Sequence, residues 1–151
     1  MLLMETNLID SVKQRIKKHE GYRDTVYLCS QGFRTIGYGH RCFDDEGWED
    51  NKKYKREVLD LQFEIDFRAS AREAEEIYEY GTEGMNARVL SILTEMVFQL
   101  GKNGVRKFKK MLRAITIKDY QEASVQMIDS KWARQTPERA KRLAKMMAEI
   151  V

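Results

Sequence analysis

The chain has 151 residues, of which 42% are hydrophobic and 34% are charged, and its formal net charge is +3. This length fits one compact domain with a real apolar core, so neither a second full domain nor general disorder is expected. No stretch approaches the roughly 20 apolar residues of a membrane span. Two cysteines and two histidines are too few for a disulfide framework or a structural zinc site.

The first third of the chain predicts a helix followed by a small sheet. Apolar residues recur at helical spacing over residues 7–19, which indicates an amphipathic helix rather than a signal peptide, with Gly21 as its stop signal. Residues 25–28 and 33–38 are rich in β-formers and flank a turn that contains Gly32. This pattern is typical of a β-hairpin.

The rest of the chain predicts helices only. An acidic, polar stretch at 43–53 indicates a surface loop, and residues 54–80 keep helical phase without Gly or Pro, as one long helix that joins two lobes. Four more helices follow: a buried central one at 87–100 closed by Gly101, two around 105–115 and 120–128, and a last one that begins at Pro137 with Thr136 as its N-cap.

Three reactive side chains stand close together in the segment from His19 to His40. Glu20 closes the first helix, Cys29 directly follows the first predicted strand and Thr35 lies in the second. A carboxyl group, a second ionisable group and a hydroxyl could therefore converge on one pocket. Glycoside hydrolysis needs such a set, with a proton donor for the leaving oxygen and a second group for water or the sugar cation.

Several motifs together resemble the phage muramidases, glycoside hydrolase family 24, the family of the T-even phage lysozymes. The motifs are Glu20-Gly21, the run from Thr35 to His40, the run from Met96 to Gly101, and Gln135-Thr136-Pro137 with Arg139. The resemblance covers about residues 10–150. It implies a mainly helical α+β, lysozyme-like fold within a single domain, 1–151. A small sheet lobe of about 20–60 would be joined by the long helix to a helical lobe of about 80–151, on which helix 7–19 packs.

The same resemblance implies an activity and a set of site residues. The substrate would be the β-1,4 bond between N-acetylmuramic acid and N-acetylglucosamine in peptidoglycan. Glu20 would protonate the leaving oxygen, while Cys29 and Thr35 would position or activate water. The resemblance also implies that Arg139 pairs with Glu20 and that His40 forms a structural pair with Asp66. It further implies a glycan-binding groove whose lining residues are Arg41, Phe98, Gln99, Met111 and Gln126. No cofactor or metal is implied.

Cys29 departs from the pattern of the T-even phage lysozymes, which carry aspartate at this position. A thiol with a pKa of about 8.5 is largely protonated at neutral pH, whereas an aspartate with a pKa of about 3.9 is ionised. We therefore hypothesise that Cys29 works partly as a thiolate, with Arg23 and Arg34 as candidate neighbours that lower its pKa. A masking Cys29–Cys42 disulfide is conceivable, but two free thiols are the simpler expectation.

The leading interpretation is a monomeric phage endolysin that binds peptidoglycan strands and neither nucleic acid nor, stably, the membrane. It would stay in the host cytoplasm until a membrane pore lets it reach the cell wall in the periplasm. Three alternatives remain: a catalytically weak or inactive peptidoglycan-binding homologue, a thiol hydrolase in which His40 serves Cys29, and a basic helical protein that binds nucleic acid and needs no Glu20.

Overall fold

The computed structural model describes residues 6–78 and 84–151. These residues form seven α-helices, one short 3-10 helix and a three-stranded antiparallel sheet, which is the mainly helical α+β class predicted. The chain divides into two compact units, Lys13–Ala69 and Met1–Val12 with Ser70–Val151. That these units act as one domain stays a prediction.

Two helices belong to both units. Helix α1 (Thr6–Glu20) begins in the larger unit and ends in the smaller one, and α2 (Arg56–Ile77) runs the other way. The predicted long helix, 54–80, is thus observed from Arg56, while its predicted end at Tyr80 lies outside the described residues. No helix of the described part of the chain is long and apolar enough to span a membrane.

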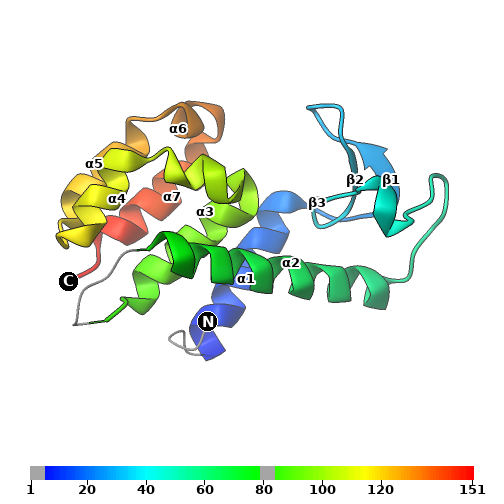
Figure 1. Ribbon diagram of the computed structural model, residues 1–151, viewed down its shortest axis with the longest axis horizontal. Coiled ribbons are helices and arrows are strands. Elements are labelled where there is room, and N and C mark those ends of the chain that lie inside the picture. The colour runs from blue at the N-terminus through cyan, green and yellow to red at the C-terminus, as the bar shows by residue number, and fades with distance from the viewer. Residues whose placement is uncertain (1–5, 79–83) are drawn as a thin grey trace. The chain divides into compact units, whose positions relative to one another are not determined.

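The sheet of the smaller unit contains β1 (Arg23–Leu28), β2 (Arg34–Gly37) and β3 (His40–Arg41) in that order (Figure 1). Strands β1 and β2 form the predicted hairpin, and β3 is an addition that the sequence did not reveal. Thr35 lies opposite both Tyr27 and Arg41, so these three residues share one face of the sheet. Ile36 on the other face is fully buried with Cys42 and Leu59.

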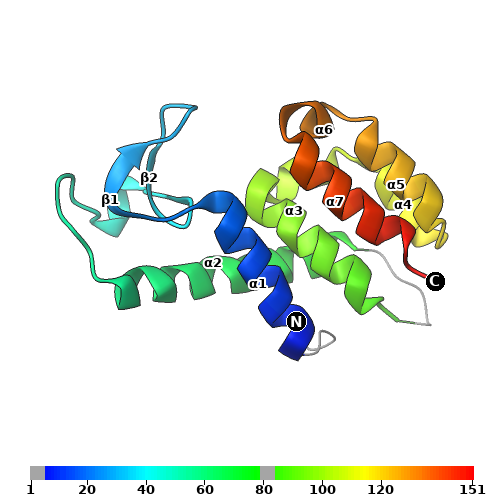
Figure 2. The same ribbon diagram turned by 180° about the vertical axis from the view of Figure 1, so that it is seen from behind.

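The larger unit is built from helices: α3 (Ala87–Arg106), α4 (Lys109–Thr116), α5 (Tyr120–Ile128), α6 (Lys131–Gln135) and α7 (Pro137–Ala148). Helix α5 packs on α4 and α7, and α7 packs in turn on α3 and α6 (Figure 2). The first half of α3 is buried almost all round, as predicted for the central helix. Gly101 has a φ of 78° and kinks α3 at the point where its end was predicted.

One prediction for this unit was wrong, and one helix was missed. The helix expected over 105–115 is broken, because Phe108 leaves helical geometry at φ −79° and ψ 58° and its ring packs edge-on against Trp132 at 5.9 Å. Helix α6 was not expected. Thr136 is the N-cap residue of α7, as predicted, but its hydroxyl donates to the Trp132 carbonyl at 3.1 Å instead of capping the helix. Pro137 does occupy the first turn of α7, as predicted.

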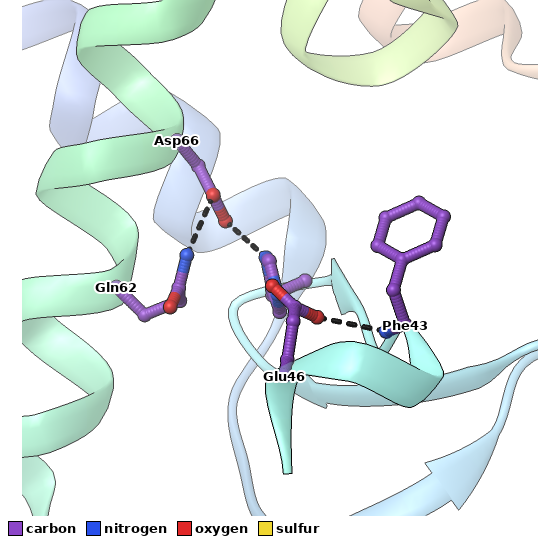
Figure 3. Close-up of polar contacts among 5 residues, drawn as sticks. Phe43, Glu46, Gln62 and Asp66 are labelled. Carbon is purple, nitrogen blue, oxygen red and sulfur yellow. Dashed lines mark hydrogen bonds and ion pairs between the residues drawn. The ribbon is translucent and has the colours of Figure 1, made fainter. Parts of the chain in front are cut away.

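A histidine between two carboxylates joins β3 to α2 and to the acidic loop. His40 Nδ1 lies 2.8 Å from Asp66 Oδ2, which is the predicted contact, and Nε2 lies 3.0 Å from Glu46 Oε2. Asp66 also accepts a hydrogen bond from the Gln62 side chain, and Glu46 accepts one from the backbone N–H of Phe43 (Figure 3). Burial lowers the pKa of His40, but the hydrogen bonds and charges of Asp66 and Glu46 outweigh it, so the pKa is raised overall.

This network predicts a stability that depends on pH. Because the folded-state pKa of His40 is raised, its stabilisation is complete below the unfolded value of about 6.5 and is lost as pH rises through the folded value. Asp66→Asn should therefore lower the free energy of unfolding by about 2 kcal/mol at about pH 5 and by much less at about pH 9. Chemical denaturation at the two pH values measures both losses.

Glu64→Gln is the matched control, because Glu64 lies on the same helix and accepts from Lys13 at 2.8 Å. This pair contains no histidine, so its loss should cost a similar amount at each pH. A loss from Asp66→Asn that is equal at both pH values would contradict the charge of His40 as the cause.

Candidate active site

Glu20 is the last residue of α1, where the chain turns into the sheet. Gly21 follows with a φ of 74° and donates its N–H to the Lys17 carbonyl at 3.0 Å, which ends the helix as predicted. The helix end thus presents a partly buried carboxyl side chain directly before β1.

The Glu20 side chain lies against Gly39, in the turn between β2 and β3. A Cβ atom placed on Gly39 would come within 2.8 Å of Glu20 Oε2 and 3.4 Å of its Cδ, and Gly39 also has a φ of 76°. Glycine is therefore needed at this position for two reasons, backbone conformation and space. The contact places the Glu20 carboxylate at the β2–β3 turn, whereas Cys29 follows β1 at the other end of the same small sheet.

Cys29 follows β1 and begins a tight turn. Its N–H donates to the Phe33 carbonyl, and its own carbonyl accepts from the N–H of Gly32, both at 2.9 Å. The pKa of the Cys29 thiol is lowered, chiefly by hydrogen bonds from the backbone of Phe33 and Gln31 and also by the Thr35 hydroxyl, against a smaller opposing effect of burial. The turn itself therefore favours a thiolate at this position.

The two arginines that the sequence suggested as neighbours of Cys29 have other contacts. Arg34 donates to Asp50 at 2.9 Å and to the Trp48 carbonyl at 2.8 Å. The Arg23 guanidinium lies 4.5 Å from the centre of the Tyr27 ring. The hypothesis of a low thiol pKa is thus supported, but its main cause is the backbone of the turn rather than a guanidinium.

Thr35 is 5% exposed, and its hydroxyl donates to the Phe33 carbonyl at 2.9 Å. Tyr27 lies directly opposite on β1, and sequence reasoning did not single it out as a site residue. Burial raises the pKa of Tyr27, Arg23 opposes this rise, and the charges of Glu20 and Cys29 add to it. Tyr27 is therefore within electrostatic reach of both. Its position two residues before Cys29 was the available signal, because alternate strand residues share a face.

Cys29 and Cys42 are both free thiols. Cys42 belongs to the small core with Ile36 and Leu59 on the other face of the sheet, and burial raises its pKa. The simpler expectation of two unpaired thiols is therefore confirmed, and only Cys29 has an environment that favours ionisation.

The remaining predicted site residues, apart from Arg41 on β3, lie in the larger unit. At the kinked end of α3, Phe98 precedes Gln99, which accepts from Trp132 Nε1 at 2.8 Å. Met111, which is fully buried, and Gln126 line one pocket of ≈ 530 Å³ together with Trp132.

Arg139 lies buried on α7, with its Nε 3.6 Å from Glu95 Oε1 on α3. Sequence reasoning did not anticipate Glu95, a carboxylate that is 1% exposed in the centre of the helical core. The predicted pair of Arg139 with Glu20 and the glycan-binding roles of the groove residues stay predictions.

A carboxyl group at a helix end, with a thiol of lowered pKa and a buried hydroxyl on the adjoining sheet, is a set of groups that glycoside hydrolysis can use. Among the residues described, no group of three His, Cys, Asp or Glu side chains could hold a metal ion. The site and the mainly helical fold thus define a lysozyme-type enzyme.

Comparison with known proteins agrees with this class. The family model described as phage lysozyme matches residues 17–148. Probable T4-type lysozyme 2 of Dictyostelium discoideum is 27% identical over 90% of this chain and 92% of its own length. The pre-baseplate central spike protein Gp5 of Enterobacteria phage T4 is 28% identical over 88% of this chain but only 27% of that protein. Peptidoglycan hydrolase gp36 of Pseudomonas phage phiKMV is 26% identical over 90% of this chain and 15% of its own. The chain belongs to the phage lysozyme family and is a glycoside hydrolase.

The contact of Glu20 with Gly39 can be tested by adding one carbon atom. Gly39→Ala should displace the Glu20 carboxylate and lower kcat about 10- to 100-fold, since small misplacements of a catalytic group have such effects. Gly47→Ala is the matched control, because Gly47 has a similar φ of 79° with nothing within 4 Å of the added carbon. Both variants should lose similar stability in thermal unfolding. A similar kcat in both would show that the contact does not matter for activity.

Proposed function

We propose that this enzyme hydrolyses the β-1,4 bond between N-acetylmuramic acid and N-acetylglucosamine in the bacterial cell wall. The observation that carries the proposal is the contact of the Glu20 carboxylate with Gly39, in the same sheet that holds Cys29 and Thr35. Names of relatives, which include lysozyme and peptidoglycan hydrolase, support peptidoglycan as the substrate.

In the proposed reaction Glu20 acts as the general acid. Its proton passes to the leaving glycosidic oxygen as the bond from that oxygen to the anomeric carbon breaks. A water molecule attacks the anomeric carbon and gives a proton to the Cys29 thiolate. Glu20 then ends as a carboxylate and Cys29 as a thiol, and exchange with solvent restores both.

The Thr35 hydroxyl supports the role of Cys29 as a base by donating a hydrogen bond to its sulfur. The hydroxyl reaches both the Phe33 carbonyl, at 2.9 Å, and the Cys29 sulfur, whose pKa it lowers. One proton serves one acceptor at a time, so the hydroxyl turns toward the sulfur when the thiolate forms. Thr35 thereby stabilises the base in the charged form that the reaction uses.

The place of action follows from the substrate. Its relatives of phage origin support action on the bacterial cell wall. We infer that the chain is held in the host cytoplasm until the membrane is permeabilised, and that it binds the glycan strands as a monomer.

Glu20→Gln tests the proposal most directly. The amide keeps the shape of the side chain but has no acidic proton to transfer, so clearing of a suspension of bacterial cell walls should fall at least about 100-fold. Glu57→Gln on α2 is the matched control, because Glu57 is exposed in the same unit, and it should retain full activity. Clearing that survives Glu20→Gln refutes Glu20 as the acid. Binding of walls without clearing by the wild type would instead favour the inactive homologue.

The role of the thiolate predicts a shift in the pH–rate profile. Activity should rise with pH as Cys29 ionises, at a lower pH than for an ordinary thiol, because its folded-state pKa is lowered. Thr35→Val removes one of the groups that lower this pKa, so the rising limb should move to higher pH. Cys29→Asp should move it to much lower pH.

Thr116→Val is the control for this experiment, since the Thr116 hydroxyl also donates to a backbone carbonyl, that of Leu112 at 3.0 Å, but on α4 of the other unit. It should leave the profile unchanged. The same rising limb in the wild type and in the Cys29→Asp variant would exclude the thiolate as the base.

A further inference from the structure

Arg41 on β3 lies between two phenylalanine rings. Its guanidinium carbon is 3.7 Å from the centre of the Phe33 ring and 5.1 Å from the centre of the Phe43 ring. Both distances are within the range of cation–π attraction, and the shorter one is that of a stacked contact. We call these three residues the arginine clamp.

The clamp lies on the surface of the smaller unit rather than in its core. Phe33 is 40% exposed and Phe43 is 51% exposed. Large aromatic side chains normally bury most of their surface, so two exposed rings on one arginine indicate a contact surface rather than a packing element.

The guanidinium of Arg41 is available to a ligand. Within the part of the chain that the structure describes, no carboxylate lies at ion-pair distance from it. Arg34 differs, because Asp50 and the Trp48 carbonyl occupy its donors. A guanidinium held in place by two rings keeps its edge N–H groups for a planar anion such as a carboxylate.

The clamp adjoins the proposed catalytic groups. Arg41 pairs with Thr35 across β3 and β2, so the two side chains share a face and stand about 5 Å apart along the hydrogen-bonding direction. The Phe33 carbonyl accepts a hydrogen bond from the Thr35 hydroxyl. A hydrogen bond from the Phe33 backbone also lowers the pKa of the Cys29 thiol. The clamp therefore lies beside Thr35 and the turn that holds Cys29.

We propose that the arginine clamp binds a carboxylate group of the substrate, so that free carboxylates on the wall strengthen its binding. Arg41 contacts the carboxylate, and Phe33 and Phe43 are positioning residues that hold the guanidinium. The inference rests on the proposed function for the identity of the glycan. Phosphate groups of wall polymers have similar chemistry, and the test separates the two sources.

Binding in the Glu20→Gln background tests the clamp without any need for hydrolysis. Two wall preparations, both stripped of phosphate polymers, are compared: one with free carboxylates and one with its carboxylates converted to amides. We expect amidation to weaken binding about tenfold, the loss of one charge-assisted pair. Arg41→Gln should weaken binding to the free-carboxylate wall by the same factor and abolish the effect of amidation.

Arg68→Gln is the matched control, because Arg68 is an exposed arginine of the same unit on α2. It should keep the full response to amidation. An amidation effect that persists in Arg41→Gln overturns the proposal. A third preparation, a free-carboxylate wall that retains its phosphate polymers, separates the two sources: a response to Arg41→Gln on this wall alone also overturns the proposal. Failure of the wild type to cleave the wall would refute the proposed function, but the binding results would still be interpretable because they require no hydrolysis.

The positioning role of the rings has its own readout in the active enzyme. Phe33→Leu and Phe43→Leu keep an apolar side chain but remove the cation–π contact, so each should raise KM several-fold on the free-carboxylate wall with little change in kcat. On the amidated wall the increase in KM should disappear. A fall in kcat with unchanged KM, or the same increase on both walls, would show a general structural effect and overturn this role.

Discussion

The close approach of the Glu20 side chain to Gly39 is the contact on which the site depends. The carboxylate occupies the space that a side chain on residue 39 would fill, so the end of α1 and the turn after β2 can meet only because that residue is glycine. The positive φ of Gly39 directs the chain back into β3 at the same point. One missing carbon atom thus allows the acid and the sheet to be held together.

The sheet then presents core and network residues on one face and proposed site residues on the other. One face carries Ile36 into the small core and presents His40 to the carboxylates of Asp66 and Glu46. The other carries Tyr27, Thr35 and Arg41 in one row across three strands. Because neighbouring strand residues alternate between faces, a hairpin of a few residues can be anchored on one side and reactive on the other.

The turn from Cys29 to Phe33 surrounds the thiol with groups that favour its ionised form. Its backbone N–H groups and the Thr35 hydroxyl favour negative charge on the side chain that follows β1. Such donors belong to the backbone of the turn, so they act on a thiolate as they would on a carboxylate. The chemistry of the position is thus shared between the side chain and the turn that holds it.

Features that depend on residues close together in the chain could be predicted from the sequence. These are the amphipathic helix that ends at Gly21, the hairpin around Gly32, the buried first half of α3 and the order of Glu20, Cys29 and Thr35. The contact of His40 with Asp66 was predicted only through the family resemblance.

Features that depend on distant residues required the tertiary structure. Strand β3 and the hydrogen bond of Thr136 involve residues close together in the chain, and the sequence pattern did not reveal them. The break at Phe108, in contrast, accompanies its packing on the distant Trp132. The space beside Gly39 and the exposed rings around Arg41 belong to the same class, because local propensity contains no information on which side chains meet across a fold.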